Sequence, residues 1–420
     1  MKVLRLSTIA LFISLLFTQC IEDFPFFGKG APKGMFTVTV ENVATDYAYY
    51  QSGVVAIPEG ATEPGPAHPG ESFMFSFHAG PKHKLSFATM YGFSNDGFFA
   101  PDGMGISLYE DGTPVEGDVT AMVKLWDAGT EMNQEPGPDN MHDGAETSDP
   151  VKEMMDVADG YDYGMVDTNI KVMLTYDGNS MFTVTVENLM DSKTGISPVA
   201  WVIHTTENPL FESGMADYGM GLEDIAETGN TAALGDYLAM NSGYVSPIAP
   251  GVWVVHHRND MPIFAEDAPE YGQGLEQLAE MGDPSGVAAS LMDMKYENSG
   301  VYNTPEGASE AGPLFPGDKY TFMFEAKAGE YLSFASMLGA SNDLFFAPGE
   351  MGIQLFDGSR AIHGDITSKV MLWDAGTEVN EYPGAQTSAD TAEDGNVRLV
   401  DDGFTYPDVD QMIKVTITKN

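Results

Sequence analysis

From Met35 to Asn42 the chain has the sequence MFTVTVEN, in which apolar and polar residues alternate. Alternation with a period of two is typical of a β-strand that buries one face and exposes the other. The same eight letters recur from Met181 to Asn188. A strand that is repeated in full indicates that a β-rich domain occurs twice in the chain.

Three further motifs are repeated in the same order. They are LSFATM and LSFASM, SNDGFFAP and SNDLFFAP, and LWDAGTE in both copies, at residues 85–90 and 332–337, 94–101 and 341–348, and 125–131 and 372–378. The first strand recurs after 146 residues, but these later motifs recur after 247. The second copy therefore contains about 101 extra residues between its first strand and its core motifs. Each copy closes on another alternating strand, at residues 170–174 and 413–417.

The extra residues are themselves duplicated. The pattern between His204 and Gly229 reappears 53 residues later, beginning at His257, and each half predicts a strand, a loop and a short helix. We therefore predict an all-β protein of two C2-like antiparallel β-sandwich domains, with short helices in the insert. The predicted boundaries are 35–178 for a shortened first domain and 181–420 for a second domain, which carries the insert at about 197–295.

The composition limits the classes of partner. Among 420 residues there are 46 Gly and 25 Pro, which suits many short strands joined by turns. The 63 acidic residues outnumber the 19 Lys and Arg, and the formal charge of −44 would repel the phosphate backbone of a nucleic acid. The acids are spread along the chain, as expected of a surface suited to a salty medium, and local cation sites are compatible with that pattern.

The first residues predict export. A basic start precedes an apolar run at residues 9–17, which is too short to remain as a membrane-spanning helix. The run is followed by Cys20, the only cysteine, whose position resembles that of the acylated residue of bacterial lipoproteins. We predict a lipoprotein-type signal peptide at 1–20, a tether at 21–34 and an outer-membrane or cell-surface location. Gln19 stands where a small residue is usual, so an ordinary signal peptide on a periplasmic or secreted protein is the alternative.

The paired motifs resemble the spondin N-terminal family. The stretch from Ser333 to Met337, followed by Ser341–Phe345, is similar to that family's Ser-Met strand and its Pro-Ser-Pro-Asp-Trp loop. Residues 372–378 resemble the family's Trp-Asp-Ala-Gly-Thr-Asp block, and residues 197–229 resemble its N-terminal half. The resemblance covers nearly all of the second predicted domain and only the later motifs of the first. It implies a C2-like antiparallel β-sandwich and an association with the extracellular matrix and cell-surface adhesion.

The resemblance also implies one calcium ion in each domain. In the family, an Asp of the loop and both acids of the later block bind calcium. At the matching positions of this chain these are Asp96, Asp127 and Glu131, and Asp343, Asp374 and Glu378. The chain departs from the family pattern, because the Trp of the loop is Gly97 or Leu344 and the last Asp is a Glu. The cysteines and thrombospondin-type repeats of animal spondins are missing as well.

Calcium suits such residues, because it takes about six to eight oxygen ligands from carboxylates, carbonyl groups and water. Gly129 and Gly376 would let each acidic loop turn tightly enough for its acids to face inward. The simpler alternative is that Asp127 and Asp374 only cap turns in a protein rich in acids. A calcium dissociation constant on the order of 10⁻⁴–10⁻³ M is expected for an extracellular module.

The sequence does not predict an enzyme. His204, His256 and His257 lie around a predicted strand without a His-Glu-x-x-His or Gly-x-Ser-x-Gly pattern, so we interpret them as structural. Trp126 and Trp373 are interpreted as packed in the sandwich. The predicted function is a lipid-anchored, calcium-binding surface module for adhesion or for binding an extracellular protein or polysaccharide. The alternatives are a glycan- or polymer-binding accessory protein and a hydrolase.

Overall fold

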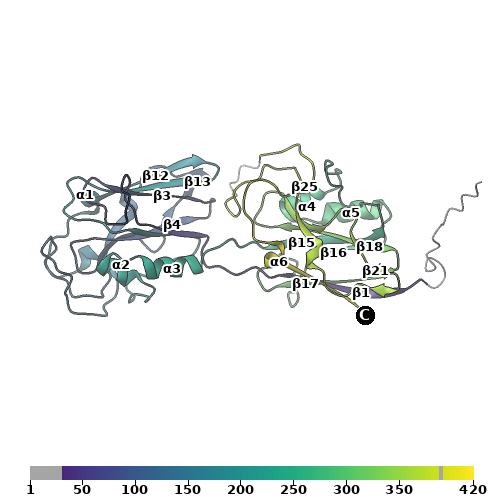
Figure 1. The fold of residues 1–420 in the computed structure, drawn as a ribbon, viewed down its shortest axis with the longest axis horizontal. Coiled ribbons are helices and arrows are strands. Elements are labelled where there is room, and N and C mark those ends of the chain that lie inside the picture. The colour runs from purple at the N-terminus through teal and green to yellow at the C-terminus, as the bar shows by residue number, and fades with distance from the viewer. Residues whose placement is uncertain (1–30, 387–390) are drawn as a thin grey trace, which may run out of the picture.

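The computed structural model describes residues 31–386 and 391–420. The predicted signal peptide, Cys20 and residues 21–30 of the predicted tether lie outside these residues. The described chain forms two lobes joined by two neighbouring segments (Figure 1). Both lobes are built mainly from antiparallel strands, which confirms the predicted all-β sandwich class. Among the described residues, no helix is both long enough and apolar enough to cross a bilayer.

One lobe, here called the inserted domain, is formed by residues 51–240. Its smaller sheet has the spatial order β3 (Ser72–His78), β13 (Met181–Asn188), β12 (Ile170–Gly178) and β9 (Gly117–Asp118). Its larger sheet has the order β2 (Gln51–Val55), β14 (Val199–His204), β4 (Lys84–Met90), β5 (Gly97–Pro101), β10 (Val123–Asp127) and β11 (Lys152–Glu153), with β6 (Ile106–Ser107) beside β4. The remaining elements are a hairpin, β7 (Tyr109–Glu110) with β8 (Thr113–Pro114), the helices α1 (Val166–Asn169), α2 (Leu222–Thr228) and α3 (Ala232–Met240), and two short 3₁₀ helices, Thr120–Met122 and Met154–Asp156.

The other lobe, here called the split domain, combines β1 with residues 248–419. Its smaller sheet has the order β17 (Lys319–Lys327), β1 (Lys33–Asn42), β26 (Ile413–Lys419) and β23 (Gly364–Asp365). Its larger sheet has the order β16 (Ser299–Tyr302), β15 (Ile248–His257), β18 (Glu330–Leu338), β19 (Leu344–Pro348), β24 (Val370–Asp374) and β25 (Arg398–Leu399), with β20 (Ile353–Gln354) beside β18. The remaining elements are a hairpin, β21 (Phe356–Asp357) with β22 (Arg360–Ala361), the helices α4 (Leu275–Met281), α5 (Ser285–Asp293) and α6 (Val409–Met412), and one short 3₁₀ helix, Thr367–Lys369.

Each domain has three layers and two apolar cores. In the inserted domain one core lies between the sheets and includes Phe73, Phe87 and Phe182. The second core lies between the larger sheet and the helices, and includes Phe98 and Leu234. The strands between the two cores, such as β4 and β5, are buried on both faces, so their sequences do not alternate. β13 has one buried face, and its sequence alternates.

The two copies of the first repeated strand do not lie where the repeat predicts. β1 lies between β17 and β26 in the split domain, with Phe36 opposite Phe324. Its copy, β13, lies between β3 and β12 in the inserted domain. The predicted boundaries of 35–178 and 181–420 are therefore wrong. The reason is physical: both copies present the same alternating face, and strand pairing joins residues that are far apart in the sequence.

The inserted domain is a circularly permuted copy of the split domain. Matching strands occupy matching places in the sheets, but their order along the chain differs. The inserted domain starts at β2, which matches β16, and ends with β13, β14, α2 and α3. In the sequence, the whole inserted domain lies between β1 and β15 of the split domain. The insert predicted at about 197–295 is thereby divided between the domains, and the first domain is complete rather than shortened.

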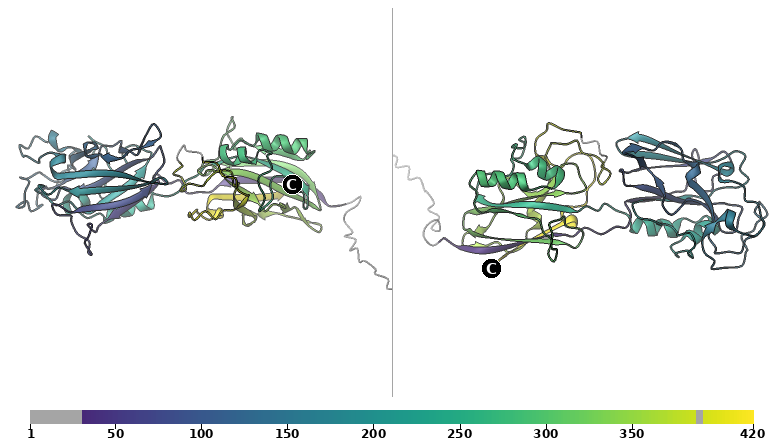
Figure 2. Two further views of the ribbon diagram at one scale, coloured as in Figure 1. Left: turned by 90° about the horizontal axis from the view of Figure 1, so that it is seen from above. Right: turned by 180° about the vertical axis from the view of Figure 1, so that it is seen from behind.

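Two linkers, residues 43–50 and 241–247, run side by side between the domains. Tyr49 and Ser242 form a parallel bridge in which the linkers are joined by main-chain hydrogen bonds. The buried Asn42 side chain donates to the carbonyl oxygens of Ser246 and Leu314, both 3.0 Å away, and holds the linkers against the split domain. α2 lies to the left of α3, and α4 to the left of α5, so the domains point the same way along the long axis (Figure 1). The two lobes stay end to end in the other views (Figure 2).

Candidate cation sites

Each candidate site lies where two loops meet at one end of the larger sheet. In the inserted domain, the loop between β4 and β5 carries Asp96, and β10 ends at Asp127. β10 pairs with β5 so that Asp127 lies opposite Gly97. The N–H of Ala128 donates to the carbonyl oxygen of Asp96, 3.1 Å away. Strand pairing therefore brings the two predicted aspartates together from separate parts of the sequence.

Asp96 is fully buried and only half of its carboxylate is satisfied. Its Oδ2 accepts hydrogen bonds from the N–H groups of Thr130 (2.8 Å) and Glu131 (3.1 Å). Its Oδ1 is buried and has no hydrogen-bond partner within residues 31–386 and 391–420. Gly129 makes this turn possible, because it has φ of 71° and a Cβ would collide with the carbonyl oxygen of Asp149. A buried carboxylate oxygen with no donor is available to a cation.

Asn133 is a site residue that the family motifs do not include. Its Nδ2 donates to Asp127 Oδ2, while its own Oδ1 is buried without a partner. The amide thus orients Asp127 and adds a second free oxygen beside it. The sequence does hold a signal, because Asn133 and Asn380 each follow the repeated DAGTE block after one residue.

The split domain repeats this arrangement. Asp343 Oδ2 accepts hydrogen bonds from the N–H groups of Thr377 (2.7 Å) and Glu378 (3.1 Å). Asp374 is fully buried, and its Oδ2 accepts a hydrogen bond from Asn380 Nδ2, 2.9 Å away. The free oxygens are again the Oδ1 atoms of the loop aspartate and of the asparagine. Equivalent oxygen atoms are therefore left without a described hydrogen-bond partner in both domains, although the strands of the two domains follow a different order along the chain.

One basic residue lies beside each site. Arg398 Nη2 lies 2.9 Å from Asp374 Oδ2 and 3.1 Å from Glu393 Oε2. In the inserted domain, Lys152 holds the matching place opposite Asp127. Arg398 offsets part of the negative charge in the split domain. Burial raises the pKa of Asp127, and the positive charge of Lys152 opposes that shift, so a basic residue acts at both sites.

Burial makes these carboxyl groups reluctant to ionise. Desolvation, and then the nearby charge of Asp127, raises the pKa of Asp96 to about 6. Desolvation, and then the charge of Asp343, raises the pKa of Asp374 to about 6. Desolvation also raises the pKa of Asp127 and of Asp343. Two adjacent buried carboxylates cost free energy when both are charged, and a bound proton or cation offsets that cost.

A tyrosine and an aspartate lie beside each site. The Tyr163 O–H donates to Asp159 Oδ2 over 2.7 Å, and the Tyr406 O–H donates to Asp402 Oδ2 over 2.9 Å. Burial is the main cause that raises the pKa of Asp127, and the negative charge of Asp159 is a smaller cause in the same direction. Asp159 is therefore within electrostatic range of the site. These pairs come from the repeated sequences DGYDY and DGFTY, which lie outside the family motifs.

The glutamate of each predicted triad differs in role from the aspartates. The Glu131 N–H donates to Asp96, and its side-chain Oε2 accepts a hydrogen bond from Asn95 Nδ2, 3.1 Å away. The Glu378 N–H likewise donates to Asp343. The structure therefore brings together the two aspartates of each predicted triad. In the inserted domain, the glutamate side chain is held by an asparagine of the neighbouring loop.

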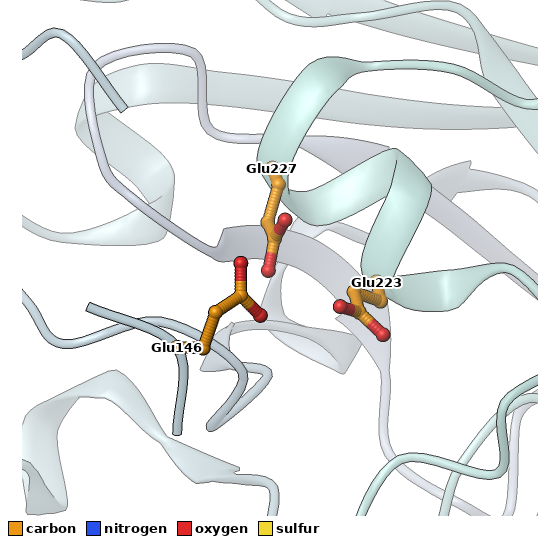
Figure 3. Close-up of side chains that lie close together, drawn as sticks. All are labelled: Glu146, Glu223 and Glu227. Carbon is orange, nitrogen blue, oxygen red and sulfur yellow. The ribbon is translucent and has the colours of Figure 1, made fainter. Parts of the chain in front are cut away.

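A second group of acids lies next to the site of the inserted domain. Within the described ranges, Glu146, Glu223 and Glu227 form the one group of three acids whose carboxylate oxygens lie within 4.8 Å of one another (Figure 3). Glu223 and Glu227 project from α2, and Glu146 comes from the segment that bridges to Glu131. Burial is the main cause that raises the pKa of Glu227 to about 7. Ala392 takes the place of Glu146 in the split domain, so the group has no complete counterpart there.

The histidines and tryptophans singled out in the sequence mostly belong to the cores. His204 and His256 are buried, and each shares a hydrogen bond of 2.9 Å with a serine of the neighbouring strand. Trp126 and Trp373 are buried, and each Nε1 donates to a main-chain carbonyl oxygen. His257 is exposed. The predicted packing of both tryptophans in the domains is confirmed.

No protein-family model matches the chain, and no curated protein matches it. The resemblance to the spondin N-terminal family is thus carried by the repeated motifs themselves. The geometry of the paired loops is the independent basis for a functional proposal.

Proposed function

We propose that this protein is an exported surface module that binds one calcium ion in each domain and serves in adhesion or extracellular ligand binding. The observation that carries the proposal is a pair of buried oxygen atoms at each site that have no hydrogen-bond partner among the described residues. These are Asp96 Oδ1 with Asn133 Oδ1, and Asp343 Oδ1 with Asn380 Oδ1. Each asparagine also binds a second buried aspartate. Turn capping alone accounts for Oδ2 of the loop aspartates, but it leaves these four oxygens without a role.

Calcium fits the donor set. It takes about six to eight hard oxygen ligands, at about 2.3–2.6 Å, from carboxylates, amide and main-chain carbonyls and water. These sites offer oxygen rather than sulfur or imidazole, which favours calcium over metals that prefer the softer ligands. Bound calcium would supply the positive charge that offsets two adjacent buried carboxylates. The residues that would hold it are Asp96, Asp127 and Asn133, and Asp343, Asp374 and Asn380.

Calcium binding is tested by calorimetry and thermal unfolding of the full chain. We expect calcium to raise the melting temperature and EDTA to reverse the effect, because only the folded protein holds the ligands together. Asp127→Ala and Asp374→Ala should each reduce the stoichiometry in isothermal titration calorimetry from two ions to one. Asp236→Ala, which removes an exposed acid on α3, is the matched control and should keep both ions. An unchanged melting temperature in calcium and in EDTA would contradict the proposal.

The proposed surface location rests on the N-terminal sequence. If Cys20 carries a lipid, the protein should partition with membranes and into detergent. Cys20→Ala is then expected to move the protein to the soluble fraction of the envelope or to the medium. Labelling with a radioactive fatty acid gives a direct readout. Equal membrane partitioning and labelling of the variant and the parent would exclude the lipid anchor.

A further inference from the structure

The site of the split domain lies beside the inserted domain. β24 ends at Asp374, and the loop that follows it holds Asn380 and then continues into a segment, residues 382–386, that is here called the docking loop. This end of the split domain faces the other lobe (Figure 1). Because the domains point the same way, the site of the inserted domain lies toward the opposite, free end of the molecule. The two sites therefore have different neighbours.

An aromatic stack and a hydrogen bond hold the docking loop against the inserted domain. The ring of Tyr382 stacks on His78, with 3.7 Å between the ring centroids and 8° between the planes. The Tyr50 O–H donates to the carbonyl oxygen of Pro383 over 2.6 Å. Stacked rings contribute about 0.5–1.5 kcal/mol beyond the area that they bury. The two contacts are specific and of modest strength.

The backbones also fit closely at this contact. A Cβ on Gly80 of the inserted domain would lie 3.1 Å from the carbonyl oxygen of Gln386 and 3.2 Å from the backbone of Ala385. Ala385 is fully buried. Gly384 lies against the rings of Tyr50 and Tyr244, and its φ of 80° suits a residue without a side chain. A side chain at Gly80 would therefore push the docking loop away without touching the cation site.

A short path connects the docking loop to the site. Asn380 donates to Asp374, and the N–H of the next residue, Glu381, donates to Asn342 Oδ1 over 3.0 Å. Tyr382 follows directly in the chain. Only Glu381 separates Asn380 from Tyr382 in the chain, so a shift of Asn380 can reach Tyr382 through a single residue. The matching loop of the inserted domain has Glu135 in the place of Tyr382, so the aromatic contact is particular to the domain whose site faces a neighbour.

We propose that a cation bound at the site of the split domain fixes the two domains relative to each other by ordering the docking loop. The inference rests on the proposed calcium binding. The paired linkers confine the domains to a hinge near Tyr49 and Ser242, and the docking loop adds a third connection. An ion held by Asp374 and Asn380 lowers the conformational entropy that the loop loses on docking. By linkage, docking strengthens ion binding at this site by the same factor.

Distance measurements between the domains test the proposal. In the full chain with Cys20→Ser, Ala61→Cys and Ala311→Cys place spin labels at exposed positions of the inserted and the split domain. Pulsed electron resonance should give a broad distance distribution in EDTA and a narrow one in calcium chloride. Asp374→Ala should keep the distribution broad in calcium, whereas Asp127→Ala should still allow it to narrow. Equal loss of the narrowing in both variants would overturn the inference.

Variants at the contact test the reciprocal effect. Tyr382→Ala and Gly80→Val should broaden the distribution in calcium, keep two bound ions, and weaken one of them about tenfold, within the usual range of coupling between sites. Glu135→Ala is the matched control and should change neither quantity. If calorimetry finds no bound calcium, the proposed function fails. If two ions bind but the distances do not respond to calcium, or Tyr382→Ala leaves both affinities unchanged, this inference alone fails.

Discussion

Asp96 illustrates at the scale of one residue how the proposed binding site opposes stability. Its carboxylate is buried beside Asp127, and its Oδ1 faces no donor. Asp96→Asn removes the charge and keeps an acceptor for the N–H groups of Thr130 and Glu131. We expect it to raise the free energy of unfolding of the calcium-free protein at pH 8 by about 1–2 kcal/mol, because a buried charge is removed. The same variant should lose one calcium ion in calorimetry, and a destabilised, calcium-binding variant would contradict this account.

The burial of His204 predicts a pH dependence of stability that does not involve the candidate cation sites. Burial lowers its pKa to about 4, and its Nε2 lies 2.9 Å from Ser86 Oγ. In the unfolded chain its pKa is about 6.5, so acid protonates the unfolded state first, and the contribution of His204 to the free energy of unfolding falls between about pH 6.5 and pH 4. The loss from this residue is about 3 kcal/mol. His204→Gln should flatten this part of the profile in urea unfolding, and an unchanged slope would refute the assignment.

At the scale of elements, the sequence predicts strands better than their partners. The alternation of MFTVTVEN correctly predicts β1 and β13, and the repeats correctly predict that two domains share one set of motifs. The pattern cannot say which sheet each copy joins, because both copies bury the same face. The candidate site of the inserted domain was likewise predicted only in part. Asp96 and Asp127 belong to motifs, whereas Asn133 and Asp159 act through contacts that only the folded loops create.

Matched substitutions in the two repeated strands test which sheet each one joins. Phe36 and Phe182 occupy equivalent positions, but Phe36 packs on Phe324 and Phe356 in the split domain, and Phe182 packs on Phe77 in the inserted domain. Each change to Ala should cost about 3–5 kcal/mol in its own domain. In hydrogen exchange, Phe36→Ala should expose β17 and β26, and Phe182→Ala should expose β3 and β12. The opposite pattern would restore the boundaries predicted from the repeat.

For the whole molecule, the permutation has a consequence for folding. The split domain is not complete until its second segment, residues 248–419, joins β1, which is made much earlier in the chain. The inserted domain has all of its strands in one continuous stretch and can fold before that. β1 must therefore stay unpaired while the inserted domain folds. Its alternating sequence, with an unpaired edge on each side, makes this intermediate prone to pairing with other chains.

Separation of the two domains tests this view of the molecule. The side-chain Nδ2 of Asn42 lies 3.0 Å from the carbonyl oxygen of Ser246. A short glycine linker from residue 43 to residue 246 can therefore replace the whole inserted domain. The shortened chain should unfold in one cooperative transition and bind one calcium ion. Residues 44–245 alone should fold as well, because Tyr49 and Ser242 hold their ends together. If the docking loop contributes as proposed, the isolated split domain should bind calcium about tenfold more weakly than it does in the full chain. An equal affinity would show that the inserted domain is joined to the split domain without influencing its site.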